Sequence, residues 1–253
     1  MPQVEAFRTA LGQITKTATT SDWENDVQDA STGTFVSNVN LTGTGTSAKS
    51  SAIAATYGAG RSGNSGTVNR VFAQFSIPSE AQGNITAITL RLLPYVNSTG
   101  NAIVAKSNAA PLNNTTYQTS DFSDYTTTAY SAVQNKASAN TIPAWSTSSS
   151  TTTTFDIALN STAVSDANSN NILKIVFMNY DHDFEVSEPP LGTFVFNGIR
   201  FVNGTSDTSG KRMRIVIDYE TGYGNNVSGV ASANIAEING VATANIGKVL
   251  GVS

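Results

Sequence analysis

The densest group of side chains that could bind a ligand is an acidic run directly after a predicted strand. It spans residues 180–185 and reads YDHDFE. Its carboxylates alternate at Asp181, Asp183 and Glu185, and calcium takes about six to eight such oxygen ligands. The run lacks the glycine-bearing spacing of an EF-hand loop. We therefore expect either an exposed acidic loop or, as the alternative, a calcium site, and no other cofactor.

The residues needed for the common kinds of catalysis are missing or unplaced. His182 is the only histidine, the chain has no cysteine, and no G-x-S-x-G motif presents a serine nucleophile. A carboxylate pair for glycoside hydrolysis is defined by its separation in space. The sequence singles out no pair among Asp156, Asp181 and Asp183, so we predict that the protein is not an enzyme.

The glycine-rich segment 58–66 resembles a phosphate-binding loop only in its glycines. It lacks the G-K-[ST] ending, and no predicted helix follows it whose N-terminal amides would hold an anion. We expect a flexible connection between two strands.

Aromatic residues in the polar stretch 108–150 offer a different kind of binding surface. An aromatic ring presents a flat apolar face with a polar edge, so Trp145 could stack on a sugar ring. The aromatics of this stretch are spaced too irregularly for one strand or helix. We expect loops that pack over the edge of the sheets, with Trp145 either as a loop anchor or as a carbohydrate contact.

Several segments alternate between apolar and polar residues, which is the pattern of strands. In the clearest one, Val71, Ala73 and Phe75 share one face, while Arg70 and Gln74 share the other. The segments are 70–77, 85–95, 155–159, 173–177 and 213–219. Since no helical pattern of about 10–15 residues separates them, we predict an all-β fold, an antiparallel β-sandwich of jelly-roll type.

The N-terminal segment gives two conflicting signals. Apolar residues between Val4 and Ile14 stand at helical spacing, whereas the threonine-rich residues 17–20 favour extended chain. Both structures stay open for this segment. The expected organisation is a candidate anchoring segment, a sandwich domain and a tail, at residues 1–30, 31–222 and 223–253.

The composition argues against a nucleic-acid or membrane partner. Charged residues make up 13% of the 253 residues, and the formal net charge is -4, where about 25% charged residues is average. Such a chain lacks the basic surface that binds a phosphate backbone. It also shows no signal peptide, whose apolar run has roughly 7–15 residues, and no membrane-length span. We expect assembly in a cytoplasm.

The last 28 residues repeat with a period of eleven. One unit begins at Val230 and the next at Val241. The matched apolar positions are Val230, Ile235 and Ile238, then Val241, Ile246 and Val249, with Val252 opening a further unit. Two such units cannot enclose a core, so they bury these side chains by stacking on other copies or on another surface. The tail is therefore predicted to mediate attachment or oligomerisation.

Three segments of the chain resemble a known family of domains. Residues 69–78 read NRVFAQFSIP and residues 85–92 read ITAITLRL, which is similar to the core of the disaggregatase-related (DNRLRE) β-sandwich domains. The strand 211–219, KRMRIVIDY, is similar to that family's final strand, except that Met213 stands where a proline is usual. The resemblance covers roughly residues 30–220 and implies a jelly-roll-like module of large surface proteins, often associated with carbohydrate.

The tail adds a second resemblance and, with it, a functional prediction. Its sequence pattern A-N-I-x-x-φ-x-G, where φ is an apolar residue, resembles terminal repeats of tailed-bacteriophage structural proteins. We predict a virion structural protein on the particle exterior: a capsid-decorating protein, or a head or tail fibre subunit. Its partners would be other virion proteins and further copies of itself, since repeated units suit a symmetric array. The alternative is a carbohydrate-binding module for adhesion to host-surface glycans.

Overall fold

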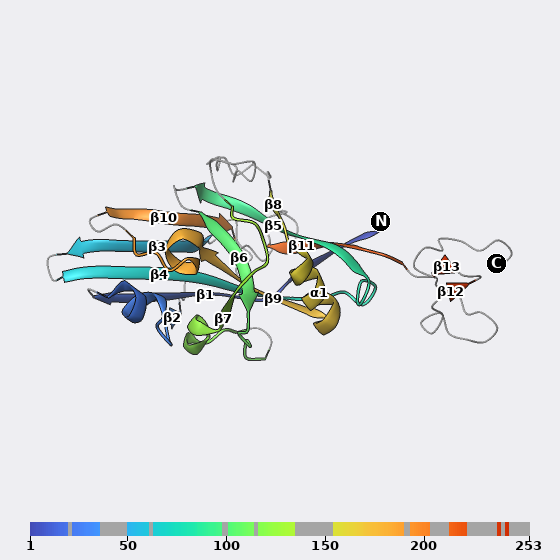
Figure 1. Ribbon diagram of the computed structural model, residues 1–253, viewed down its shortest axis with the longest axis horizontal. Helices are drawn as coiled ribbons and strands as arrows, with labels where there is room; N and C mark the ends of the chain where they lie inside the picture. Colours follow the sequence, from blue (N-terminus) through green and yellow to red (C-terminus); the bar gives the residue numbers. More distant parts are fainter. Residues whose placement is uncertain are drawn as a thin grey trace.

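The structure is a computed structural model that describes most of the chain. The described residues are 1–19, 22–35, 50–60, 63–97, 101–113, 116–134, 154–189, 193–202, 213–221, 237–238 and 241–242. Figure 1 shows β10, β3, β4 and β1 side by side along the longest axis of the molecule.

Strands dominate the described residues, and the alternating segments of the sequence all lie in or along them, as predicted. The strands are β1 (Gln3–Thr19), β2 (Thr34–Phe35), β3 (Ser50–Gly60), β4 (Gly63–Ser76), β5 (Ile85–Asn97), β6 (Ala102–Ser107), β7 (Tyr125–Ala129), β8 (Phe155–Ala158), β9 (Ile172–Asn179), β10 (Thr193–Val202), β11 (Arg214–Tyr219), β12 (Glu237–Ile238) and β13 (Val241–Ala242). The helical elements are η1 (Glu24–Gln28), η2 (Thr119–Ser123), α1 (Ser161–Asn170) and η3 (Tyr180–Phe184).

The large sheet is antiparallel, and it curls so that β1 and β4, which are not neighbours in its strand order, also pair. Its order is β2-β1-β11-β5-β10-β3-β4-β9-β6-β7, with β8 on β5 and a further pairing of β1 with β4. β1 closes a ring of strands: residues 3–7 pair with β11, residues 8–19 pair with β4, and the register shifts between Arg8 and Ala10. The layer β1-β11-β5-β8 thereby faces the layer β4-β9-β6-β7. The fold is an all-β, jelly-roll-like sandwich, which confirms the predicted class.

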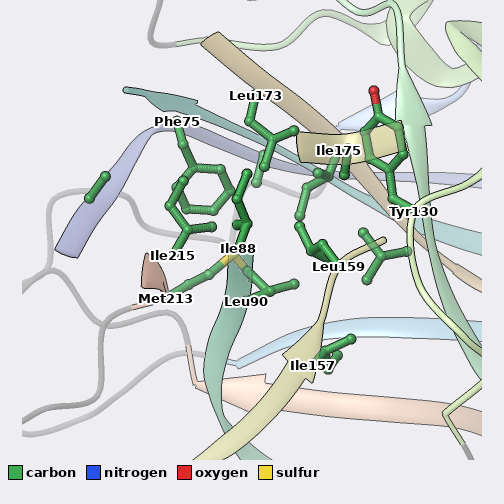
Figure 2. Packing of buried hydrophobic residues seen from close by; sticks show 14 of the residues in the cluster. Phe75, Ile88, Leu90, Tyr130, Ile157, Leu159, Leu173, Ile175, Met213 and Ile215 are labelled. Carbon is green, nitrogen blue, oxygen red and sulfur yellow. The ribbon is translucent and has the colours of Figure 1, made fainter. Parts of the chain in front are cut away.

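The main core lies between these two layers. Phe75 of β4 and Leu173 and Ile175 of β9 face Ile88 of β5 and Ile215 of β11 (Figure 2). All five side chains are buried. Removing such a side chain from water contributes about 1.5–3 kcal/mol to the stability of the fold, so the alternating pattern itself drives these strands together.

The opposite face of β4, β9 and β6 is buried as well. Phe72, Val176 and Ile103 pack there against Trp23, beside η1, and Phe122 of η2. Because successive side chains of a strand point to opposite faces, this second cluster takes the alternate residues of the same strands. The described part of the stretch 108–150 thus covers a sheet face with η2 and β7, where loops over the sheet edge were predicted.

β1 decides between the two signals of the N-terminal segment in favour of extended chain. Its residues 10–14 are all buried, with Leu11 in the main core and Ala10 and Ile14 in the second cluster. Burial on both faces removes the alternation by which a strand is recognised. Residues 3–19 therefore belong to the sheet, and an anchoring role for residues 1–30 stays a prediction.

Most of the glycine-rich segment lies in two paired strands, where a flexible connection between strands was predicted. β3 and β4 stay paired as far as Gly60 and Gly63. At Gly66, a Cβ atom would lie 2.9 Å from Val27 Cγ2 and 3.0 Å from Trp23 Cε3. Glycine at this position therefore lets η1 pack directly on the backbone of β4.

α1 occupies a segment for which no helix was predicted. The side-chain oxygen of Asn160 accepts hydrogen bonds from the backbone N–H groups of Thr162 and Ala163, each at 3.1 Å. Asn171 ends the helix in the left-handed region, with φ at 56°. Ala163 and Ala167 are buried in the main core, and their small size lets the helix approach the sheets. Within the described residues, no helix has the length and apolar content to cross a membrane.

Candidate functional site

A groove between α1 and the neighbouring ends of β6 and β9 is the candidate binding site. Its volume is about 420 Å³, inside the range of roughly 300–1,000 Å³ that is usual for small-molecule sites. Most of its lining residues are polar. They are Lys106, Ser107, Asn108, Tyr130, Asp166, Asn170, Ile172 and Lys174. Hydrogen-bond donors and acceptors thus stand side by side in the groove, as a small polar ligand requires.

Asp166 is the central charge of the groove. Lys106 Nζ lies 2.8 Å from Asp166 Oδ2, and the hydroxyl of Tyr130 donates a hydrogen bond to the same oxygen. Tyr130 is held from both sides, since its N–H donates to the carbonyl of Val104 at 2.8 Å and its carbonyl accepts from the N–H of Asn160 at 2.7 Å. Figure 2 shows the ring of Tyr130 beside the core and its hydroxyl pointing away from it.

These contacts fix the protonation states in the groove. Hydrogen bonds from Lys106 and Tyr130 hold the pKa of the Asp166 carboxyl below its ordinary value. Burial, together with the hydrogen bond to Asp166, raises the pKa of the Tyr130 phenol. At neutral pH Asp166 is therefore a carboxylate, and Tyr130 is a neutral donor.

Lys174 adds a positive charge that Asp166 does not neutralise. It lies on β9 opposite Gln74 of β4, and it forms no ion pair with any residue that the structure describes. The pairing of β6 with β9 ends at Lys106 and Ile175, so residues 172–174 form a strand edge on this side. Leu173 and Ile175 face the main core, so Lys174 lies on the opposite face of β9, where its charge acts on Asp121 of η2.

The acidic run 180–185 forms neither the exposed loop nor the shared oxygen cluster that the sequence predicts. η3 turns Asp183 inward, where the carboxylate lies 2.6 Å from Arg70 Nη2 and both side chains are fully buried. Asp181 Oδ1 instead accepts a hydrogen bond from Asn101 Nδ2 at 3.0 Å, and Glu185 is exposed. Among the described residues, no three His, Cys, Asp or Glu side chains are arranged to hold a metal ion.

Arg70 gives Asp183 a structural role. The guanidinium donates to the carbonyls of Phe122 and Gln28, both at 2.7 Å, and its carbon lies 4.1 Å and 4.2 Å from the ring centroids of Phe122 and Tyr125. The Arg70 side chain of β4 thus holds η1, η2 and η3 in place. The sequence did not indicate this ion pair. It placed Arg70 only on the second face of its strand, and the partner Asp183 lies 113 residues away.

The remaining predicted site residues are placed apart from the groove or outside the described residues. Asp156 pairs with Arg91 Nη2 at 2.7 Å on the partly exposed face of β5 and β8, so it does not join Asp183. Trp145 lies outside the described residues. So do the tail residues Val230, Ile235, Ile246, Val249 and Val252.

The tail is described at the boundary between its two units. β12 and β13 pair antiparallel there, with Ile238 opposite Val241 and Glu237 opposite Ala242. They make a two-stranded sheet of their own, which Figure 1 shows apart from the large sheet.

Two comparisons, with protein-family models and with curated proteins, gave no match for the chain. The resemblance to the disaggregatase-related domains therefore stays a prediction.

The groove residues were not singled out by the sequence. Lys106 and Asp166 are 60 residues apart and meet only because α1 packs beside β6 and β9. One local signal was available: Asn160 is a good N-cap residue, and Ala163 and Ala167 follow at helical spacing. That pattern predicts a short helix at 161–170 with a small apolar face.

Proposed function

We propose that the protein is a structural component of a bacteriophage virion, displayed on the particle exterior and assembled through its C-terminal repeat. The sandwich is the displayed body, and the repeat contacts other copies of the chain or neighbouring virion proteins. The protein has no catalytic role in this proposal.

The observation that carries the proposal is the match between the β12–β13 pairing and the eleven-residue period. Ile238 is paired with Val241 across the two strands. One period earlier the equivalent positions hold Val227 and Val230, and one period later they hold Val249 and Val252. The dipeptide between Ile238 and Val241 is Asn-Gly, which favours the tight turn of a hairpin. The repeat is thus suited to a series of similar hairpins.

Hairpins of this size need a partner. A two-stranded hairpin alone is marginal in water, and short repeats become stable only when neighbours cover their apolar side. Symmetric copies of the chain offer such neighbours, because the same surface recurs on each copy. Low charge together with abundant Ser, Thr and Asn suits a body that works outside the cell after assembly inside it.

The test compares the full chain with a variant that lacks residues 225–253. We expect the full chain to be oligomeric by light scattering and to enter virions when supplied during infection, and we expect the truncated chain to lose both properties. The paired substitution Ile238→Asp and Val241→Asp should act in the same way, with Glu237→Gln as the matched control. Equal oligomeric state and incorporation for all variants would overturn the proposal.

The groove favours a second candidate function, a carbohydrate-binding module that attaches to surface glycans. Its polar lining and its volume suit a sugar better than an apolar ligand. A glycan array probed with the full chain tests this function, and Trp145→Ala shows whether the aromatic side chain contributes. Absence of any glycan binding would rule out the second function and leave the first intact.

A further inference from the structure

We infer that a second pocket, formed where η1, η2 and β7 cover the second hydrophobic cluster, binds an amino sugar, that is, a hexose ring with hydroxyl groups and one free ammonium group. The second pocket is lined by Gln28, Asp29, Ser123, Tyr125, Thr126 and Thr127. The inference rests on the second proposed function, because it names a site and a ligand class for carbohydrate binding.

The Arg70 guanidinium holds the walls of the second pocket in place. It donates to the carbonyls of Gln28 and Phe122, both at 2.7 Å, and its carbon lies 4.2 Å from the ring centroid of Tyr125. One buried group therefore positions η1, η2 and β7 together. Walls that are already ordered lose little entropy when a ligand binds. The volume of about 300 Å³ is at the lower end for small-molecule sites, so it suits one sugar ring.

Two acceptors in the second pocket are not used by the protein. Gln28 is only 1% exposed. Its Nε2 donates to the Tyr125 hydroxyl at 3.0 Å, whereas its Oε1 has no hydrogen-bond partner in the part of the chain that the structure describes. Asp29 is exposed, and its carboxylate forms no ion pair with any described residue. A buried acceptor without a partner is unfavourable, so the second pocket favours a ligand with several donors.

The charge of the second pocket favours a cation. Arg70 and Asp183 neutralise each other, and Asp29 is the one charged residue among the described lining residues. Burial raises the pKa of the Tyr125 phenol against the effect of Arg70, and the charges of Asp183 and Asp29 raise it further. Tyr125 is therefore a neutral hydroxyl at neutral pH. An ammonium group has three donors and one positive charge, which match the carboxylate of Asp29 and the free acceptor of Gln28.

The hydroxyl groups of the second pocket favour a sugar ring around that ammonium group. Ser123 Oγ donates to the carbonyl of Ser31 at 3.2 Å, and Thr126 Oγ1 donates to the carbonyl of Lys106 at 3.4 Å. Both oxygens keep lone pairs that can accept from a ligand hydroxyl, and a ligand hydroxyl can also accept from the protein. A calcium ion fits less well, because it takes about six to eight oxygen ligands and only one carboxylate lines the second pocket.

The experiment is an NMR titration of the full chain with glucosamine, with glucose and with methylammonium, all at the same ionic strength. We expect glucosamine to shift the amide signals of residues 28–29 and 123–127 until they saturate. Glucose lacks the charge and methylammonium lacks the ring, so both should bind more weakly. Asp29→Asn should weaken glucosamine binding about tenfold, the size of one lost charge-assisted hydrogen bond. Glu24→Gln makes the same charge change at an exposed position of η1 outside the lining. It is the matched control and should leave the binding unchanged.

Three outcomes would overturn the inference. They are the absence of saturable shifts in the second pocket, equal affinity for glucose or methylammonium, and equal effects of the Asp29 and Glu24 substitutions. Equal affinity for methylammonium would assign the second pocket to ammonium groups in general, lysine side chains included. An array on which the chain binds neutral glycans but no glycan with a free amine would leave the second function standing and remove only this inference. Failure to bind any glycan, together with no glucosamine shifts, would remove both.

Discussion

Arg70 on β4 and Asp183 in η3 form an ion pair that is fully shielded from water, with 2.6 Å between Nη2 and Oδ1. The carboxylate also accepts from Arg70 Nε at 3.0 Å. Two buried charges are tolerated only when each satisfies the other. The pair therefore fixes the position of the connecting segments that cover the second hydrophobic cluster.

Removing one partner of this pair should destabilise the fold strongly. Asp183→Asn leaves the Arg70 guanidinium buried without a counter-charge, so we expect the free energy of unfolding to fall by about 3–5 kcal/mol. Urea denaturation followed by tryptophan fluorescence measures the loss. The matched control is Asp156→Asn, whose partner Arg91 is partly exposed, and a loss of at most about 1 kcal/mol is expected there. Similar losses at both positions would contradict the structural role of Asp183.

The main core should be sensitive to cavity formation at Leu173, which is fully buried. Leu173→Ala removes side-chain atoms that face Phe75 and Ile88, and we expect a loss of about 2–5 kcal/mol in the free energy of unfolding. Leu112 is 52% exposed, so Leu112→Ala should change the stability by no more than about 0.5 kcal/mol. Chemical denaturation of the two variants makes the comparison, and equal losses would speak against the layered core.

How readily the sequence predicts a strand depends on whether one of its faces carries polar side chains. β5 buries one face, so Leu90 stands between the polar residues Thr89 and Arg91 and the strand was found. β1 buries both faces between Ala10 and Ile14, so its sequence shows no period of two. β4 also buries both faces, but it was found because Arg70 and Gln74 on its second face are polar. A strand between two clusters is therefore recognised where one of its faces carries polar side chains.

The candidate site was harder to predict than the fold, for a different physical reason. Asp183 lies in an acidic run of the kind that is usually exposed to solvent. Its burial becomes favourable only through the ion pair with Arg70, which is distant in the sequence. Lys106, Asp166 and Lys174 come from separate elements, and no motif connects them. Patterns in the sequence report short-range structure, whereas these pairs depend on how the layers stack.

The stability contributed by Asp166 should depend on pH. Its pKa is lower in the folded protein, first because of the hydrogen bond from Lys106. The contribution is therefore complete above the ordinary carboxyl value of about 3.9, and it is lost as the pH falls through the lower folded value. The pair is partly exposed, so Asp166→Asn should cost at most about 1 kcal/mol at pH 7. The difference between the two proteins should shrink toward zero in acid, and a pH-independent difference in urea midpoints would contradict this reasoning.

The cap of α1 should control both the helix and the groove beside it. Asn160 accepts from two N–H groups of the first turn, and its Nδ2 donates to the carbonyl of Ala129 at 2.7 Å. Asn160→Ala removes all three hydrogen bonds, so we expect a loss of about 1 kcal/mol or more in the free energy of unfolding.

The effect should be concentrated in α1, because the same substitution frees the start of the helix from β7. Hydrogen exchange of the α1 amides should become faster in Asn160→Ala, while the amides of β4 and β9 keep their protection. Ser165→Ala, at an exposed position of the same helix, is the control and should leave exchange unchanged or slightly slower, since alanine favours helix more than serine does. If the exchange in α1 were the same in both variants, Asn160 would not be what holds Asp166 over the groove.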